Sequence, residues 1–228
     1  MSQAILTERV GRTSVFVGWW ATTAVGIYVT ATVLGGLLDP SYSHVSMHVS
    51  ELPSSHAPNR VLLAGMYVGY NAALGGLGFA LLKHLKRSRW LVVASWLLVA
   101  NAVAGVLTVT WFPQDSYGYP STTAGAVHIS LGGVLALLSI LVMFTAGRAF
   151  RSHMAWATLG RFSTAAAVVM VVTGLATAVA TAAASPYMGL LERLPIGTFL
   201  LWLAAVAWYG FRYQPELSPA AGGSVDGY

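Results

Sequence analysis

The sequence contains no cysteine among its 228 residues. Disulfides, thiolate nucleophiles and cysteine-ligated metals are therefore excluded, and any metal site must use histidine and carboxylate ligands. Only 8% of the residues are charged, whereas soluble domains contain about a quarter. Because 56% of the residues are hydrophobic, the composition is that of a membrane protein.

The sequence also lacks any recognisable DNA- or RNA-binding motif, although its formal net charge is +5. Its basic residues lie beside apolar runs and not on an amphipathic face, so membrane topology explains the charge better. We therefore expect membrane lipid and a lipophilic small molecule as partners, and no nucleic acid.

Six apolar runs are long enough to cross a hydrocarbon core, which needs about 20 helical residues. They cover residues 15–38, 61–82, 90–112, 127–147, 162–184 and 196–212. The first run is too long for a signal-peptide core and has no clear cleavage site, so we expect it to be retained. The sequence predicts an all-α, polytopic bundle of six transmembrane helices over residues 1–212. A Pro- and Gly-containing tail, residues 213–228, is expected to be disordered.

The basic residues predict the orientation of this bundle. All Lys and Arg residues except Arg60 and Arg193 fall on the side of the termini. The positive-inside rule therefore predicts a multi-pass protein of the cell membrane with both termini in the cytoplasm.

Most acids and histidines are predicted on the opposite, outer side. Residues 39–53 are the densest such stretch and contain His44, His48 and Glu51. If residues 43–52 are helical, these three fall at i, i+4 and i+7 on one face. A connector lying on the membrane surface, with its polar face in water, explains the same pattern, so both interpretations stay open.

A second outer stretch follows the third run, where Pro113 is expected to end the helix just before Asp115. The chain then reaches His128 at the start of the fourth run. Asp115 and His128 thereby return to the side of Glu51 and His48, where the four side chains can converge as catalytic residues. The nearby Trp111 and Phe112 are also explained by an interfacial aromatic belt.

Two amides, Asn71 and Asn101, lie near the middle of the second and third runs, where an unpaired amide is costly. We expect them to bond to each other or to facing backbone, or alternatively to line a cavity. The adjacent Glu192 and Arg193 are expected to form a solvated pair or an interfacial half-turn.

Two pairs of motifs carry a family resemblance: Ser-Tyr-Ser-His44 with Ser50-Glu51-Leu, and Phe112-Pro-x-Asp115 with Gly125-x-x-His128. Together they resemble the membrane family catalogued as domain of unknown function number 998. The likeness spans most of the six-helix region, implies the fold and points to the outer cluster, but it implies no reaction. Glu51-Leu-Pro stands here where we expect Glu-Leu-Gly.

Glu51 and Asp115 among aromatic residues are also similar in type and arrangement to the small integral-membrane terpene cyclases of fungal and actinobacterial meroterpenoid pathways. That resemblance implies that Asp115 or Glu51 protonates a polyprenyl olefin or epoxide, with acidity tuned by His128 or His48. No cofactor is expected. Aromatic faces, each worth about 0.5 to 2 kcal/mol to a cation, and the two amides would line the substrate site: Tyr28, Tyr67, Tyr70, Trp111, Phe112, Asn71 and Asn101.

Two other classes of function remain open. In a zinc-dependent hydrolase of a lipid ester or amide, His44, His48 and His128 would hold the metal. The His-x-x-x-His spacing alone is a weak signal for this. In a non-enzymatic lipid-binding or sensor protein, the outer acids and histidines would titrate without catalysis.

Overall fold

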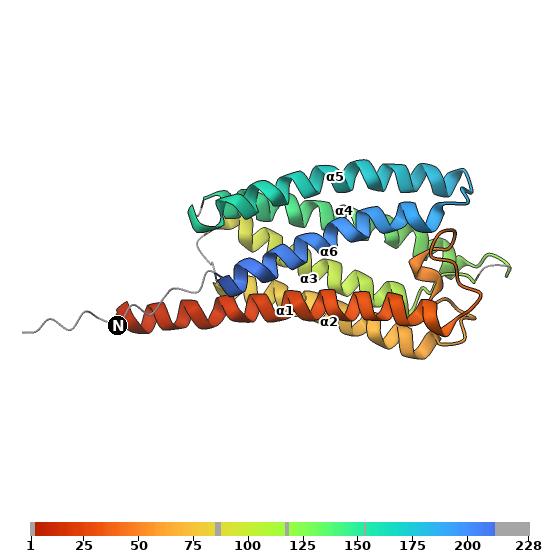
Figure 1. Cartoon of the computed structure of the whole chain (residues 1–228), viewed down its shortest axis with the longest axis horizontal. Coiled ribbons are helices and arrows are strands. Elements are labelled where there is room, and N and C mark those ends of the chain that lie inside the picture. The colour runs from red at the N-terminus through yellow and green to blue at the C-terminus, as the bar shows by residue number, and fades with distance from the viewer. Residues whose placement is uncertain (1–2, 85–87, 117–118, 153, 213–228) are drawn as a thin grey trace, which may run out of the picture.

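A computed structural model describes residues 3–84, 88–116, 119–152 and 154–212 (Figure 1). Within these ranges the chain forms helices and no strand. The long helices are α1 (Gln3–Leu38), α2 (Arg60–His84), α3 (Arg89–Thr110), α4 (Thr123–Arg151), α5 (Ala157–Ala182) and α6 (Met188–Arg212). Each is long and apolar enough to cross a membrane, which confirms the predicted six-helix membrane class. The predicted tail, residues 213–228, lies outside the described residues.

The six helices form a closed ring, since each packs against its neighbour in sequence and α6 also packs against α1. The larger apolar core draws on all six helices and includes the fully buried Trp202, Phe150 and Leu81. It fills the part of the ring nearer the termini. A second, smaller cluster of buried residues lies at the opposite end of the ring.

That second end, which we call the outer end after the predicted orientation, is filled by the connection between α1 and α2. Residues 39–59, the outer segment, lie at the end of the bundle away from the N-terminus (Figure 1). Tyr42, Val49 and Leu52 from this segment join a smaller buried cluster with Leu63 and Tyr67 of α2. The outer segment is therefore part of the packed structure.

The sixth helix begins earlier than predicted, at Met188 and not at residue 196, and it contains Pro195. A proline inside a helix cannot donate to the carbonyl four residues earlier, which here belongs to Leu191. The hydroxyl of Thr177 in α5 donates to that oxygen instead, at 2.8 Å. A neighbouring helix thus satisfies the freed carbonyl, as membrane helices with proline require.

Three of the other five helices, α1, α4 and α5, begin clearly before the predicted apolar runs. Hydropathy marks only the part of a helix that lies in hydrocarbon, whereas backbone hydrogen bonding continues through polar residues at the interface. The early start of α6 is the extension that matters for function, because it places Glu192 and Arg193 on a helix.

Candidate functional site

The outer segment is not the single helix that would place His44, His48 and Glu51 on one face. Only Val49–Glu51 is helical, as one 3-10 turn. The hydroxyl of Ser43 accepts from the backbone N–H groups of Val45 and Ser46, both at 3.3 Å. This side-chain bonding competes with helical backbone bonding. The three side chains consequently have different partners.

Glu51 ends the 3-10 turn with its carboxyl folded back on the chain. Its Oε1 accepts from the backbone N–H of His48 at 3.0 Å. Its Oε2 is buried and has no hydrogen-bond partner among the described residues. Burial raises the pKa of Glu51 above its ordinary value, and the His48 N–H opposes this only in part. The site therefore favours the protonated acid more than water does.

His48 connects the outer segment to the first turns of α6. Its Nδ1 lies 3.4 Å from Oε1 of Glu192, and these side chains are 25% and 19% exposed. The other oxygen of Glu192 accepts from the backbone N–H of Val49 at 2.6 Å. The contact with the Glu192 carboxylate raises the pKa of His48, because it stabilises the imidazolium.

Arg193, the next residue of α6, binds the other half of the outer segment. One terminal nitrogen donates to the hydroxyl of Tyr42 at 2.6 Å and lies 3.0 Å from Nδ1 of His44. Because a guanidinium only donates, His44 accepts here and is neutral. The other nitrogen donates to the carbonyls of Gly189 (2.8 Å) and Met47 (3.3 Å). Partial burial and the neighbouring guanidinium lower the pKa of His44.

The sequence led us to expect that Glu192 and Arg193 form a solvated pair or an interfacial half-turn. The structure instead places both residues on α6 and in contact with the outer segment. They bind His48 and Tyr42, which lie more than 140 residues earlier in the chain. The only advance signal was that Arg193 is one of two basic residues on the acidic, histidine-containing side. Burial raises the pKa of Tyr42 to about 12 despite the adjacent Arg193, so its hydroxyl keeps the proton that it donates to the His48 carbonyl.

Asp115 belongs to a separate network at the start of α4. Its two oxygens accept from the hydroxyl and the backbone N–H of Thr122, at 2.7 and 2.9 Å. Thr122 in turn caps α4 by accepting from Gly125. These hydrogen bonds lower the pKa of Asp115, so this exposed carboxylate stays ionised. The structure brings Asp115 to the outer end without a hydrogen bond to Glu51.

The two outer stretches do meet, through hydrogen bonds between other residues. The hydroxyls of Ser54 and Ser116 are 2.8 Å apart, and Ser116 also accepts from the backbone N–H of His56 at 2.9 Å. His128 donates from Nδ1 to the Phe112 carbonyl at 2.8 Å. It lies within electrostatic range of Glu192 and His48. His128 is therefore near the outer network, while its own hydrogen bonds go to the backbone of Phe112 and of Thr108.

Three tyrosines of the predicted substrate site form one aromatic group beneath the outer segment. The ring of Tyr28 contacts those of Tyr67 and Tyr70 edge-to-face, at centroid distances of 5.4 and 4.9 Å. Tyr67 shares its buried cluster with Val49 and Leu52, which flank Glu51 closely in sequence. Trp111, in contrast, is 74% exposed, and Phe112 is only partly buried. The tyrosine group thus adjoins the buried cluster that contains Val49 and Leu52, the sequence neighbours of Glu51.

The two buried amides make packing contacts. Asn101 donates to Leu135 O (3.1 Å) and Ser139 Oγ (2.9 Å) of α4, and Asn71 donates to Tyr67 O of its own helix (2.8 Å). The expected bonding to facing backbone therefore holds for Asn101.

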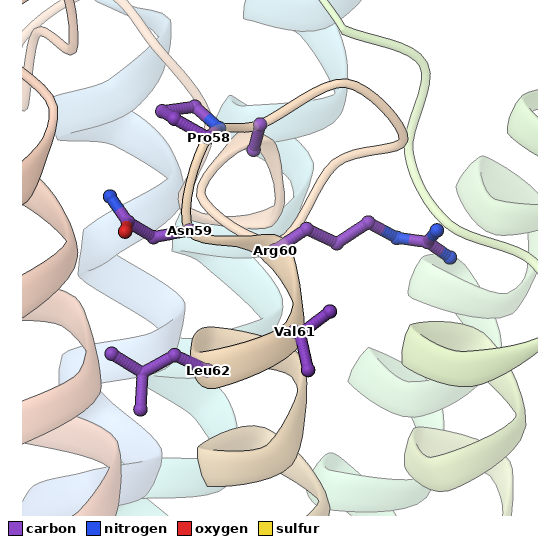
Figure 2. Close-up of a pocket in the computed structure, with 6 residues that line it drawn as sticks. Pro58, Asn59, Arg60, Val61 and Leu62 are labelled. Atoms are coloured by element: carbon purple, nitrogen blue, oxygen red, sulfur yellow. The ribbon is translucent and has the colours of Figure 1, made fainter.

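The three histidines of the zinc hypothesis contact Arg193, Glu192 and the Phe112 carbonyl. No group of three His, Asp or Glu side chains in the described part of the chain is arranged to hold a metal ion. An open pocket lies elsewhere, around the start of α2, where Asn59 and Arg60 point in opposite directions (Figure 2). Its lining residues, 57–62, include none of the predicted site residues.

The family model described as "Protein of unknown function (DUF998)" matches residues 22–209. The chain belongs to the DUF998 family. This match covers all four motifs of the resemblance, which is thereby confirmed. No curated protein and no solved structure matches this DUF998 protein. Its site is accordingly interpreted from its own geometry, and the resemblance to membrane terpene cyclases remains a hypothesis.

Proposed function

We propose that this DUF998 protein is a membrane terpenoid cyclase in which Glu51 protonates a polyprenyl olefin or epoxide. The observation that carries the proposal is the buried, unpartnered Oε2 of Glu51. Burial disfavours the ionised form of this carboxyl, so its proton is retained until an apolar substrate binds. Glu51 takes the role of acid in preference to Asp115, whose carboxylate is exposed and stabilised by Thr122.

The reaction begins when Glu51 transfers its proton to the less substituted carbon of the terminal double bond. This step leaves a carboxylate on Glu51 and a tertiary carbocation on the substrate. The next double bond attacks that cation and closes a ring. A proton is finally lost from the carbon beside the last cation, so an olefin substrate is isomerised with no change in composition. With an epoxide, the same proton goes to oxygen, and the opened ring becomes a hydroxyl group.

The remaining residues of the outer end support these steps. The faces of Tyr28, Tyr67 and Tyr70 stabilise the cation in a region that excludes water. His128 accepts the proton that is lost at the end. That proton returns to Glu51 through solvent. His48 and Glu192 hold the turn that carries Glu51.

The test is to reconstitute the protein in vesicles prepared in deuterium oxide and to supply linear polyprenyl olefins. Mass spectrometry should detect a cyclic product with one carbon-bound deuterium. Glu51→Gln should abolish it, a loss of at least about 100-fold, while Asp115→Asn should retain activity. An active Glu51→Gln variant would overturn the assignment of Glu51, and a product without deuterium would overturn protonation as the first step.

A second function, sensing of pH at the outer end without catalysis, is favoured by one observation. Two of the three histidines of the outer segment contact neighbouring residues of α6 that have opposite charges, His48 a carboxylate and His44 a guanidinium. The packing of the outer segment then depends on pH even in the Glu51→Gln variant. A protein with this pH response, but with no product from any polyprenyl substrate, would support sensing over cyclisation.

The orientation also belongs to the proposal. The positive-inside rule places the termini in the cytoplasm of a cell membrane and the outer segment outside. Glu51 would then be reprotonated from the extracytoplasmic side.

A further inference from the structure

Two exposed arginines share one tryptophan ring at the end of the bundle opposite the outer segment. The guanidinium carbon of Arg148, near the end of α4, lies 4.7 Å from the centroid of Trp90. That of Arg89, the first residue of α3, lies 5.4 Å from the same centroid. Trp90 packs against the main apolar core, which fixes the position of its ring.

These two positive charges have no acidic partner among the described side chains. The only ion pair described is that of His48 and Glu192, at the other end. Asp39, Glu51 and Asp115 also lie at the outer end, in or after segments that follow α1 and α3. Neighbouring like charges repel most strongly where lipid lowers the dielectric constant. An anion between them would relieve this repulsion, and the planar guanidinium matches the oxygens of a phosphate.

An apolar, exposed stripe continues from Arg89 along α3 into the membrane-spanning part. Val93, Trp96 and Val103 are 45%, 55% and 56% exposed. Their spacing from residue 89 puts all of them on one face of the helix. A ligand bound at Arg89 therefore meets a hydrocarbon-facing surface directly beneath its charged group. This arrangement suits a phospholipid better than free phosphate, whose ions have no apolar part.

We propose that Arg89, Arg148 and Trp90 bind the phosphate of an anionic phospholipid whose acyl chain lies along Val93, Trp96 and Val103. Two guanidinium groups favour a lipid with net negative charge, because in phosphatidylcholine the headgroup cation already neutralises the phosphate. The site is independent of the proposed chemistry at the outer end.

Native mass spectrometry of the full chain tests the site, using detergent-purified protein titrated with phosphatidylglycerol or phosphatidylcholine. Wild type should retain phosphatidylglycerol, and Arg89→Gln/Arg148→Gln should bind it at least about tenfold more weakly, since each arginine in contact with the bound phosphate contributes roughly fivefold. Trp90→Leu keeps both charges and should also weaken binding, because both guanidinium groups lose the aromatic ring that positions them.

Arg161→Gln/Arg212→Gln is the matched control. It removes two exposed arginines from the same end that share no ring, and it should change phosphatidylglycerol binding less than about twofold. An equal loss in the control variant would show only general attraction to a basic surface and would overturn the site. So would equal retention of phosphatidylcholine by wild type, or displacement of the lipid by millimolar inorganic phosphate. These last two measurements need no substitution, so they decide the matter even if a variant fails to fold.

Discussion

Nδ1 of His48 lies 3.4 Å from Oε1 of Glu192, and this pair joins the outer segment to the start of α6. The outer segment and α6 are connected a second time, because Glu192 accepts from the backbone N–H of Val49. The carboxyl of Glu51 depends on this arrangement, since its Oε1 accepts from the backbone N–H of His48. Movement of His48 away from α6 would therefore also displace the proposed acid.

The ion pair predicts a pH dependence of the outer segment. The folded-state pKa of His48 is raised above its unfolded value of about 6.5. Its stabilising contribution is therefore complete below pH 6.5 and is lost as the pH rises through the folded pKa. Amide hydrogen exchange of residues 39–59, corrected for the pH dependence of the intrinsic exchange rate, should therefore show decreasing protection as the pH rises from about 6.5 through the folded-state pKa of His48.

Glu192→Gln should remove this pH dependence and cost about 1 kcal/mol at pH 6. His56→Ala is the control, because His56 lies in the same segment but stacks on Tyr119. A pH profile that is unchanged in Glu192→Gln would contradict the role of the pair.

Arg193 should not be replaceable by lysine. Its fork donates to Tyr42, Gly189 and Met47 at once, which one ammonium group cannot reproduce. We expect Arg193→Lys to lower the free energy of unfolding of the outer segment by about 2 kcal/mol. Local exchange rates measure this. Amide exchange in Arg193→Lys that is as slow as in wild type would show that the contacts of Arg193 contribute little to the stability of the outer segment.

At Gly189 the backbone of α6 lies directly against the backbone of the outer segment. A Cβ there would overlap the carbonyl oxygen of Met47 and would lie only 2.7 Å from the carbonyl oxygen of His44. Both are backbone atoms, so Gly189→Ala should separate the outer segment from α6 and increase proteolysis within residues 39–59. Gly197→Ala, in the same helix but with open space around it, should have no such effect. Equal proteolysis of the two variants would contradict the docked position.

Thr177 and Pro195 should show energetic coupling. Thr177→Val removes the donor to the Leu191 carbonyl and should lower the stability by about 1 to 2 kcal/mol. In a Pro195→Ala background the alanine N–H can bond to that carbonyl, so the same substitution should cost less there. A double-mutant cycle from thermal unfolding in one detergent measures the coupling, and additive effects would show that the carbonyl does not need Thr177.

The absence of cysteine makes the orientation directly testable. Single cysteines at the exposed Ser46 and Ser152 lie in the outer segment and at the opposite end. A membrane-impermeant maleimide added to intact cells should label Ser46→Cys and not Ser152→Cys. The reverse pattern would place the termini outside.

The helical part of this structure was accessible from the sequence because hydrocarbon imposes a simple rule on composition and length. Six apolar runs therefore predicted six helices, and the early start of α6 was missed because Pro195 resembles a helix boundary. The second half of the site could not be predicted in this way. His48 binds Glu192 only because α6 closes the ring on α1, and nothing in one sequence relates two residues so far apart.

The outer segment shows the same limit at short range. The spacing of His44, His48 and Glu51 fits a helix, yet the hydroxyl of Ser43, just before them, accepts from the backbone and holds a turn. The acidic residues could be identified from the sequence, whereas the raised pKa of Glu51 and the lowered pKa of Asp115 could not be predicted from it. That difference follows from burial: Oε2 of Glu51 is enclosed, while Asp115 is exposed and bonded to Thr122.

The protonation state of Glu51 tests the account most directly, and it can be measured without a known substrate. Infrared difference spectra of the reconstituted protein, recorded during a pH titration, report the protonated carboxyl groups. We expect a band that persists above the ordinary carboxyl pKa of about 4.3, that is absent in Glu51→Gln, and that remains in Asp115→Asn. A spectrum in which this band survives in Glu51→Gln, or in which all carboxyls ionise at ordinary pH, would contradict the assignment of Glu51 as the acid.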